Sequence, residues 1–222
     1  MKRVFVVLAI LLLAAAGFAK KPGGASIQFG YQLSNVDAAK KATERMGLDV
    51  SSTNELVLDF NGWVVMNRFF RMGGGISGGY FDTKEEPDQE LINEEEAGVG
   101  FTDIRLFFLP EFQMDFGPIN VSGGVGVGAG DIITWVTDGV GDNDQDMYFY
   151  AFARPQIGAG YDFGPMGARL TIGYHMPLTS EEGEFWFYNP AMEKVTEPFE
   201  TTDMGGVFFE LGIFFGDLGM KD

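Results

Sequence analysis

The sequence predicts an all-β fold in which eight antiparallel strands close an up-and-down barrel. Three observations support this prediction. Large apolar residues recur at every second position from Ser26 onwards, short and long connections alternate along the chain, and the residues between the apolar ones are mostly glycine. A period of two indicates strands, because successive side chains of a strand point to opposite faces of a sheet.

Eight alternating segments are predicted as strands. They cover 26–33, 56–64, 70–80, 104–116, 119–129, 147–163, 168–176 and 207–215. Tight turns are expected near 67, 116 and 164, and long loops at roughly 34–53, 82–98, 130–146 and 178–204. An even number of strands with short turns at one end and long loops at the other is the layout of an outer-membrane barrel.

Two of the tight turns share the tetrapeptide Asp-Phe-Gly-Pro, at 115–118 and 162–165. Proline cannot donate to a strand ladder and glycine can take positive φ, so each copy predicts a strand end followed by a sharp turn. The kinase Asp-Phe-Gly motif is excluded, because the chain has no Gly-rich nucleotide loop and no His-Arg-Asp segment.

The first 19 residues predict a secretory signal peptide. Lys2 and Arg3 precede an apolar run at 4–16, and small residues end at Ala19, before Lys20. The run is about 13 residues long, whereas a membrane-spanning helix needs roughly 20. We therefore divide the chain into a signal peptide, 1–19, and a barrel domain, 20–222.

Composition excludes several classes of function. The chain has no cysteine, so disulfides and thiol chemistry are absent, and with a single histidine we expect neither a transition-metal site nor a cofactor. A formal net charge of −17 does not favour nucleic acid as a partner. Acidic loops such as Glu94–Glu96 are compatible with weak binding of divalent cations at a cell surface.

The residues between the large apolar ones decide which face looks outward. A water-facing set should be rich in lysine and glutamate, but here it is mostly glycine with isolated charges and no lysine. Such a set fills a narrow barrel well. The apolar set is then lipid-facing, with Tyr31, Tyr80, Tyr161 and Tyr174 as girdle residues. Pro110 and Pro155 fall on this set, and we expect them near the periplasmic end or at bulges.

In this layout, residues 24–218 resemble the small eight-stranded outer-membrane barrels of the OmpA-, OmpX- and OmpW-like group. The resemblance implies a transmembrane β-barrel with short periplasmic turns and long outer loops, monomeric, in contact with lipid of the cell outer membrane. Many members of such families end on an aromatic residue. Here Asp217–Asp222 follow the last strand, so either recognition differs in the source organism or Phe215 serves as the signal from slightly inside.

The inward set carries the candidate site, a lumen charge network. Its members are Arg71, Arg105, Arg154, Arg169, Asp59, Asp103, Glu111 and Glu210. Charges in so narrow a space should pair, because an unpaired buried charge is costly. They predict either a structural network that plugs the barrel or a charge-lined narrow pore, and eight strands favour the plug.

Four other segments contain residues that could carry chemistry or bind a partner. His175 faces inward near the outer rim, with Ser180 close in sequence and no third catalytic group, so an enzyme is not expected. Asp142–Asp146 opens like a calcium loop, but Met147 replaces the required glycine, which leaves an acidic, solvated loop. Residues 37–46 suggest a short outer helix, and Glu184–Tyr188 a hairpin with girdle residues.

The sequence thus predicts an outer-membrane barrel with a structural or surface-interaction role. Two alternatives stay open: a narrow channel for small solutes, and a soluble periplasmic binding protein resembling lipocalins, in which the apolar set would face inward.

Overall fold

A computed structural model describes residues 22–34, 37–46, 54–82, 97–138, 143–188 and 193–216. The predicted signal peptide and the residues after the last strand lie outside these ranges, as do 83–96 and 139–142 of the acidic loops.

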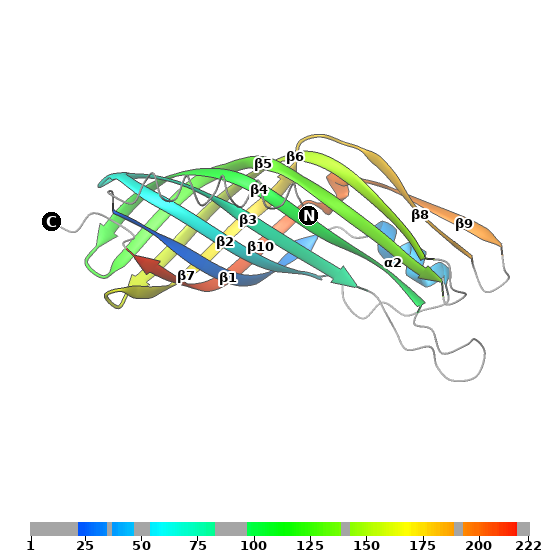
Figure 1. Ribbon diagram of the computed structural model, residues 1–222, viewed down its shortest axis with the longest axis horizontal. Helices are drawn as coiled ribbons and strands as arrows, with labels where there is room; N and C mark the ends of the chain where they lie inside the picture. The colour runs from blue at the N-terminus through cyan, green and yellow to red at the C-terminus, as the bar shows by residue number, and fades with distance from the viewer. Residues whose placement is uncertain are drawn as a thin grey trace, which may run out of the picture.

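Eight strands form a closed barrel in the order β1-β10-β7-β6-β5-β4-β3-β2, and every neighbouring pair is antiparallel. Figure 1 shows the barrel lengthwise. The predicted architecture is confirmed. The strands are β1 (Gly23–Ser34), β2 (Asn54–Asn67), β3 (Phe70–Asp82), β4 (Ala97–Phe116), β5 (Ile119–Asp138), β6 (Asn143–Asp162), β7 (Met166–Pro177) and β10 (Gly206–Gly216).

The tight turns lie where the repeated tetrapeptide places them. Gly117 has a φ of 67° and Gly164 a φ of 116°, values that residues with a Cβ rarely adopt. The Gly164 backbone N–H also donates to the Asp162 side chain at 2.6 Å. The third turn follows Asn67, whose side chain accepts from the Phe69 N–H at 2.9 Å. All three predicted turns are confirmed, and they lie at one end of the barrel (Figure 1).

The turn at Gly164 gives a first testable prediction. Gly164→Ala should destabilise the folded barrel by about 1–2 kcal/mol, because a Cβ meets no atom there but the backbone is strained. Urea unfolding in lipid vesicles measures this change. Gly78→Ala is the matched control, since an added Cβ there lies 4.0 Å from its nearest neighbour at ordinary φ. Equal losses for the two variants would contradict the conformational argument.

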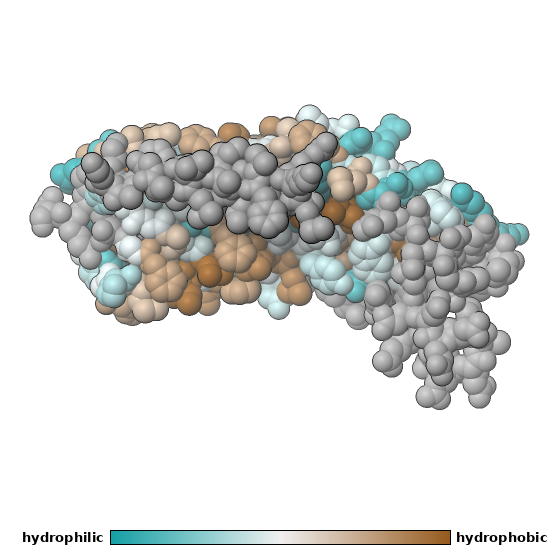
Figure 2. All heavy atoms as spheres, in the orientation of Figure 1, coloured by the Kyte–Doolittle hydropathy of each residue, from teal (hydrophilic) through white to brown (hydrophobic). Residues whose placement is uncertain are grey.

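The outer surface of the barrel is apolar. Figure 2 shows hydrophobic side chains along the barrel, with hydrophilic ones gathered toward the end that carries β8 and β9. The outward set includes large apolar residues that are each at least 45% exposed: Phe29, Tyr31, Leu33, Phe60, Ile104, Phe108, Phe112, Ile157, Leu170 and Leu211. The four predicted girdle tyrosines also face outward.

A soluble barrel has the opposite distribution, with apolar residues inside. Here the interior is polar, the exterior is apolar, and closure leaves the ring without unpaired edges that lipid would not tolerate. The protein is therefore a transmembrane β-barrel of the outer-membrane type. The lipocalin-like alternative is therefore wrong. It required the large apolar residues to face inward, and they are exposed on the outside of the barrel.

Both strand prolines lie in the turn-side half of a continuous strand, and neither forms a bulge. Pro110 pairs with Met72 of β3, and Pro155 pairs with Val125 of β5. On its other side, each proline has no paired residue: the β4–β5 pairing skips Pro110 and the β6–β7 pairing skips Pro155. The register of each strand pair is the same before and after this gap. The prolines therefore interrupt hydrogen bonding locally and do not create bulges. The register shift in the barrel that the structure does show lies between Val65 and Asn67.

An additional layer covers the outer end. It contains the predicted helix, α2 (Asp37–Arg45), the hairpin of β8 (Glu182–Tyr188) and β9 (Lys194–Glu200), and the turn η1 (Thr201–Met204). In the described residues, no helix has the length and apolar character that a membrane span requires. Phe185 and Phe187 are buried at 1% and 0% exposure, so they form a core in this layer instead of a girdle.

The predicted long loop at 130–146 is largely strand. β5 continues to Asp138 and β6 begins at Asn143, so these strands run past the ring together with β4. Asp144 and Asp146 pair with Val136 and Thr134 in this extension, which corrects the acidic loop expected there. The cause is contact with the hairpin: Ile132 and Val136 on β5 are buried in the same core as Phe185.

Candidate functional site

All eight predicted charged residues point into the barrel and are at most 4% exposed. They come from six strands, β2, β3, β4, β6, β7 and β10, and the alternation of side chains places each of them inside. Together with Glu55 they form three clusters, each at a different level of the lumen.

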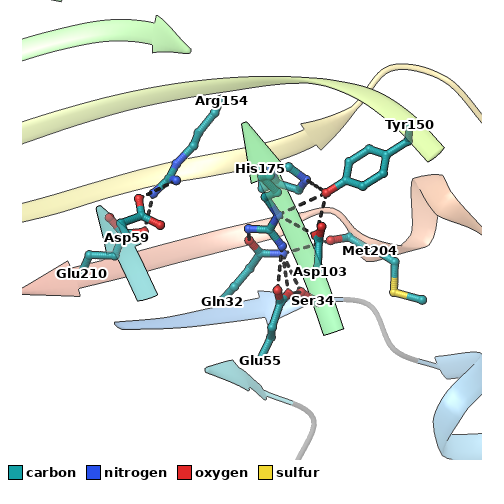
Figure 3. A network of polar contacts seen from close by, with 11 residues as sticks. Gln32, Ser34, Glu55, Asp59, Asp103, Tyr150, Arg154, His175, Met204 and Glu210 are labelled. Carbon is teal, nitrogen blue, oxygen red and sulfur yellow. Dashed lines mark hydrogen bonds and ion pairs between the residues drawn. The ribbon is translucent and has the colours of Figure 1, made fainter. Parts of the chain in front are cut away.

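The cluster nearest the outer layer is centred on Arg105. Its guanidinium donates to Glu55 at 2.6 Å and to Asp103 at 2.5 Å, and it also donates to the side-chain oxygen of Gln32 at 3.0 Å. Glu55 accepts further bonds from Gln32 and Ser34, both at 2.9 Å. Figure 3 shows these groups converging from β1, β2 and β4. One cation thus holds two fully buried carboxylates.

Tyr150 links this cluster to His175. The phenol donates to Asp103 at 2.6 Å and lies 3.1 Å from Nε2 of His175 (Figure 3). With the phenol hydrogen on Asp103, a hydrogen bond between Tyr150 and His175 requires the Nε2–H tautomer of His175. The Tyr150 and His175 rings meet edge to face, and the centroid of the Phe152 ring is 4.7 Å from that of the imidazole.

His175 faces inward near the outer end of β7, as predicted, and is fully buried. Ser180 lies elsewhere, on the exposed outer layer, where its hydroxyl donates to Glu200 at 2.8 Å. His175 and Ser180, the candidate catalytic pair, therefore contact different residues and not each other.

The middle cluster is centred on Arg154. Its guanidinium is 2.7 Å from Asp59 and also donates to Glu210 (Figure 3). The same group stacks on Phe208, with its carbon 3.9 Å from the ring centroid, and lies 5.3 Å from the centroid of Phe107. Aromatic faces and carboxylates therefore surround this cation.

The lower cluster reverses the pattern, with two cations on one carboxylate. Glu111 accepts from Arg71 at 2.7 Å and from Arg169 at 2.6 Å. Ser122 donates to Glu111 at 3.0 Å and accepts from both arginines. A cavity of about 10 Å³, room for roughly one water molecule, adjoins Arg169 and Gln156.

Apolar groups pack beside the lower cluster and beyond the upper one. Trp63, Val65 and Phe214 are buried together at the level of the lower cluster, and the centroids of the Trp63 and Phe214 rings are 6.3 Å apart in an edge-to-face contact. Toward the outer layer, the aromatic core of the hairpin and α2 follows. Among the described residues, no three His, Asp or Glu side chains gather in a way that could hold a metal ion.

Two members of the network were missed at the level of sequence. The predicted strand begins at Leu56 and so excludes Glu55, although Glu55 is two residues from the inward-facing Val57 and shares its face. Tyr150 was assigned to the inward set, but its bond to Asp103 joins residues 47 positions apart. Periodicity gives a side chain's direction and not its partner across the lumen.

Comparison with known proteins gives loose likenesses only. No family model matches the chain, and no curated protein sequence matches it. Among solved structures, Ail, the attachment invasion locus protein of Yersinia pestis, is 12% identical over 88% of this chain and 99% of its own, with a TM-score of 0.41.

Two further solved structures are similar at the same level. The outer membrane protease OmpT from Escherichia coli is 10% identical over 88% of this chain and 94% of its own, with a TM-score of 0.41. The translocator domain of the autotransporter NalP from Neisseria meningitidis is 9% identical over 96% and 95%, with a TM-score of 0.38. Likenesses of this kind assign no activity or ligand to the chain.

Proposed function

We propose that this outer-membrane barrel has a plugged lumen and a structural or surface-interaction role. The observation that carries the proposal is the filling of the lumen. Three ion-paired clusters occupy the lumen, the rings of Trp63 and Phe214 pack beside the lower one, and an aromatic core covers the outer end. An eight-stranded barrel has an interior that side chains can fill in this way.

The outer layer supports a role at the cell surface. It is a folded unit, because α2 packs Ala39 and Ala42 into the core and Arg45 pairs with Glu197 of β9 at 3.0 Å. Its exposed residues include Glu181, Glu182, Glu184 and Glu200. We propose that such acidic groups gather divalent cations weakly and that the barrel acts as a monomer.

The proposed role is not enzymatic. His175 is enclosed by Tyr150 and Phe152, and Ser180 is engaged with Glu200, so neither offers a nucleophile beside a base. The refolded protein should therefore release no fatty acid from phospholipid vesicles. Hydrolysis that disappears in His175→Ala would contradict this expectation.

The proposal is tested by conductance in planar lipid bilayers. The refolded barrel should be silent, because ion-paired side chains that are at most 4% exposed occupy the lumen. Glu111→Ala and Arg105→Ala serve as comparisons, since each removes the centre of one cluster without touching the apolar rings. Stable single-channel steps in the unsubstituted protein that change in either variant would support the second candidate, a narrow channel for small solutes.

A further inference from the structure

The extension of β5 and β6 beyond the ring has an exposed apolar face. Met147 and Phe149 of β6 are 64% and 61% exposed, and Ile133 and Trp135 of β5 are partly buried beside them. We call these four residues the β5–β6 outer face. Ile133 pairs directly with Met147, so the two strands present one surface.

This surface lies beyond the part of the barrel that β7 covers. The pairing of β6 with β7 ends at Phe152 and Pro177, before Phe149 is reached. Along β6 the same alternation continues down to Ile157, which is 64% exposed in the lipid-facing belt. The β5–β6 outer face therefore lies on the same side of the sheet as the lipid-facing belt, with Ala151 and the buried Ala153 between them.

The other sides of the extension are already occupied. Its inner face packs Ile132 and Val136 against the hairpin. Its free edge on β6 is also covered: the N–H of Phe149 donates to Glu181, and the N–H of Ala151 donates to Thr179, each at 2.9 Å. Backbone pairing with an added strand is thus blocked at these positions, and the apolar face is what is left for a partner.

Trp135 is a residue type that suits this face to the interfacial layer of a membrane. Its ring lies across Gly100 of β4, where an added Cβ would be 2.1 Å from Cζ2 of the indole. Asp131, which pairs with Phe149, lies on the barrel side of Ile133 and places a charge between this face and the rest of the belt. Tryptophan is enriched in the layer between hydrocarbon and water.

We propose that the β5–β6 outer face lies against outer-leaflet lipid and that the barrel leans toward this side in the membrane. On the opposite side the outward apolar set ends with Leu33 of β1 and Leu56 of β2, since β1 stops at Ser34. The apolar surface is therefore taller on one side. Tilting brings a taller apolar surface into contact with a bilayer of fixed thickness. This inference rests on the transmembrane barrel and is independent of whether the lumen conducts.

Site-directed spin labelling tests the proposal, because the chain has no cysteine of its own. Phe149→Cys carries a nitroxide in phosphatidylcholine–phosphatidylglycerol vesicles, and Met147→Cys is a second position. Leu211→Cys is the lipid control, since Leu211 is 62% exposed and Phe149 61%. Thr196→Cys on exposed β9 is the water control. Relaxation by oxygen, which partitions into lipid, is compared with relaxation by a water-soluble nickel chelate.

We expect the label at 149 to resemble the label at 211, with oxygen the stronger relaxant. A label that resembles the one at 196 would overturn the proposal while leaving the barrel in the bilayer. Spin–spin broadening that vanishes on dilution with unlabelled protein would overturn it in favour of a second copy of the chain. A nickel-accessible label at 211 would instead reject the membrane barrel itself, together with the proposal.

Discussion

Arg105→Ala should lower the free energy of unfolding by about 3–5 kcal/mol, because it leaves two buried carboxylates without their shared cation. Glu55 and Asp103 are both fully buried, and Arg105 is bonded to each of them at 2.6 Å or less. Equilibrium unfolding by urea in lipid vesicles measures the loss. The unfolding transition should occur at a lower urea concentration. On a denaturing gel, the unboiled variant should also lose the band of the compact folded barrel, which boiling converts to the unfolded form.

The matched control for this loss is Arg45→Ala. Arg45 also pairs with a glutamate, Glu197, but its side chain is 54% exposed, so the change should cost less than about 1 kcal/mol. Adding Glu55→Gln and Asp103→Asn to Arg105→Ala should restore part of the stability, because the orphaned charges are then removed. A loss for Arg105→Ala no larger than the control's would show that the cluster contributes nothing to stability.

Leu211→Arg should destabilise the membrane-inserted barrel by about 2–4 kcal/mol, the cost of a cation on the lipid face near the bilayer midplane. Leu211 lies midway along β10, pairs with Phe29 on one side and Leu170 on the other, and is 62% exposed. In a water-soluble barrel the same change at so exposed a site would be nearly neutral. The measurement is refolding yield and urea stability in vesicles.

Thr196→Arg controls for the general effect of an added positive charge. Thr196 is exposed on β9, outside the barrel ring, and its substitution should change stability by less than about 0.5 kcal/mol. If Leu211→Arg were as well tolerated as Thr196→Arg, the apolar exterior would not be facing lipid.

Alternation alone was enough to predict the ring. Because side chains change face at every residue of a strand, the positions of Ile104, Leu106 and Phe108 specify an exposed face, and those of Asp103 and Arg105 specify a buried one. The turns were equally local, since Asp-Phe-Gly-Pro contains both the strand-ending proline and the glycine that takes positive φ. Strand number, face and turn position therefore follow from near neighbours in the chain.

Partners across the lumen do not follow from near neighbours. Arg169 and Glu111 are 58 positions apart, and Tyr150 meets Asp103 from another wall of the barrel. The length of β5 and β6 was underestimated for the same reason: their outer parts are held by Phe185 and Phe187, which arrive much later in the chain. A period of two records which side of a sheet a residue takes, whereas pairing and strand length depend on contacts that only closure of the barrel brings together.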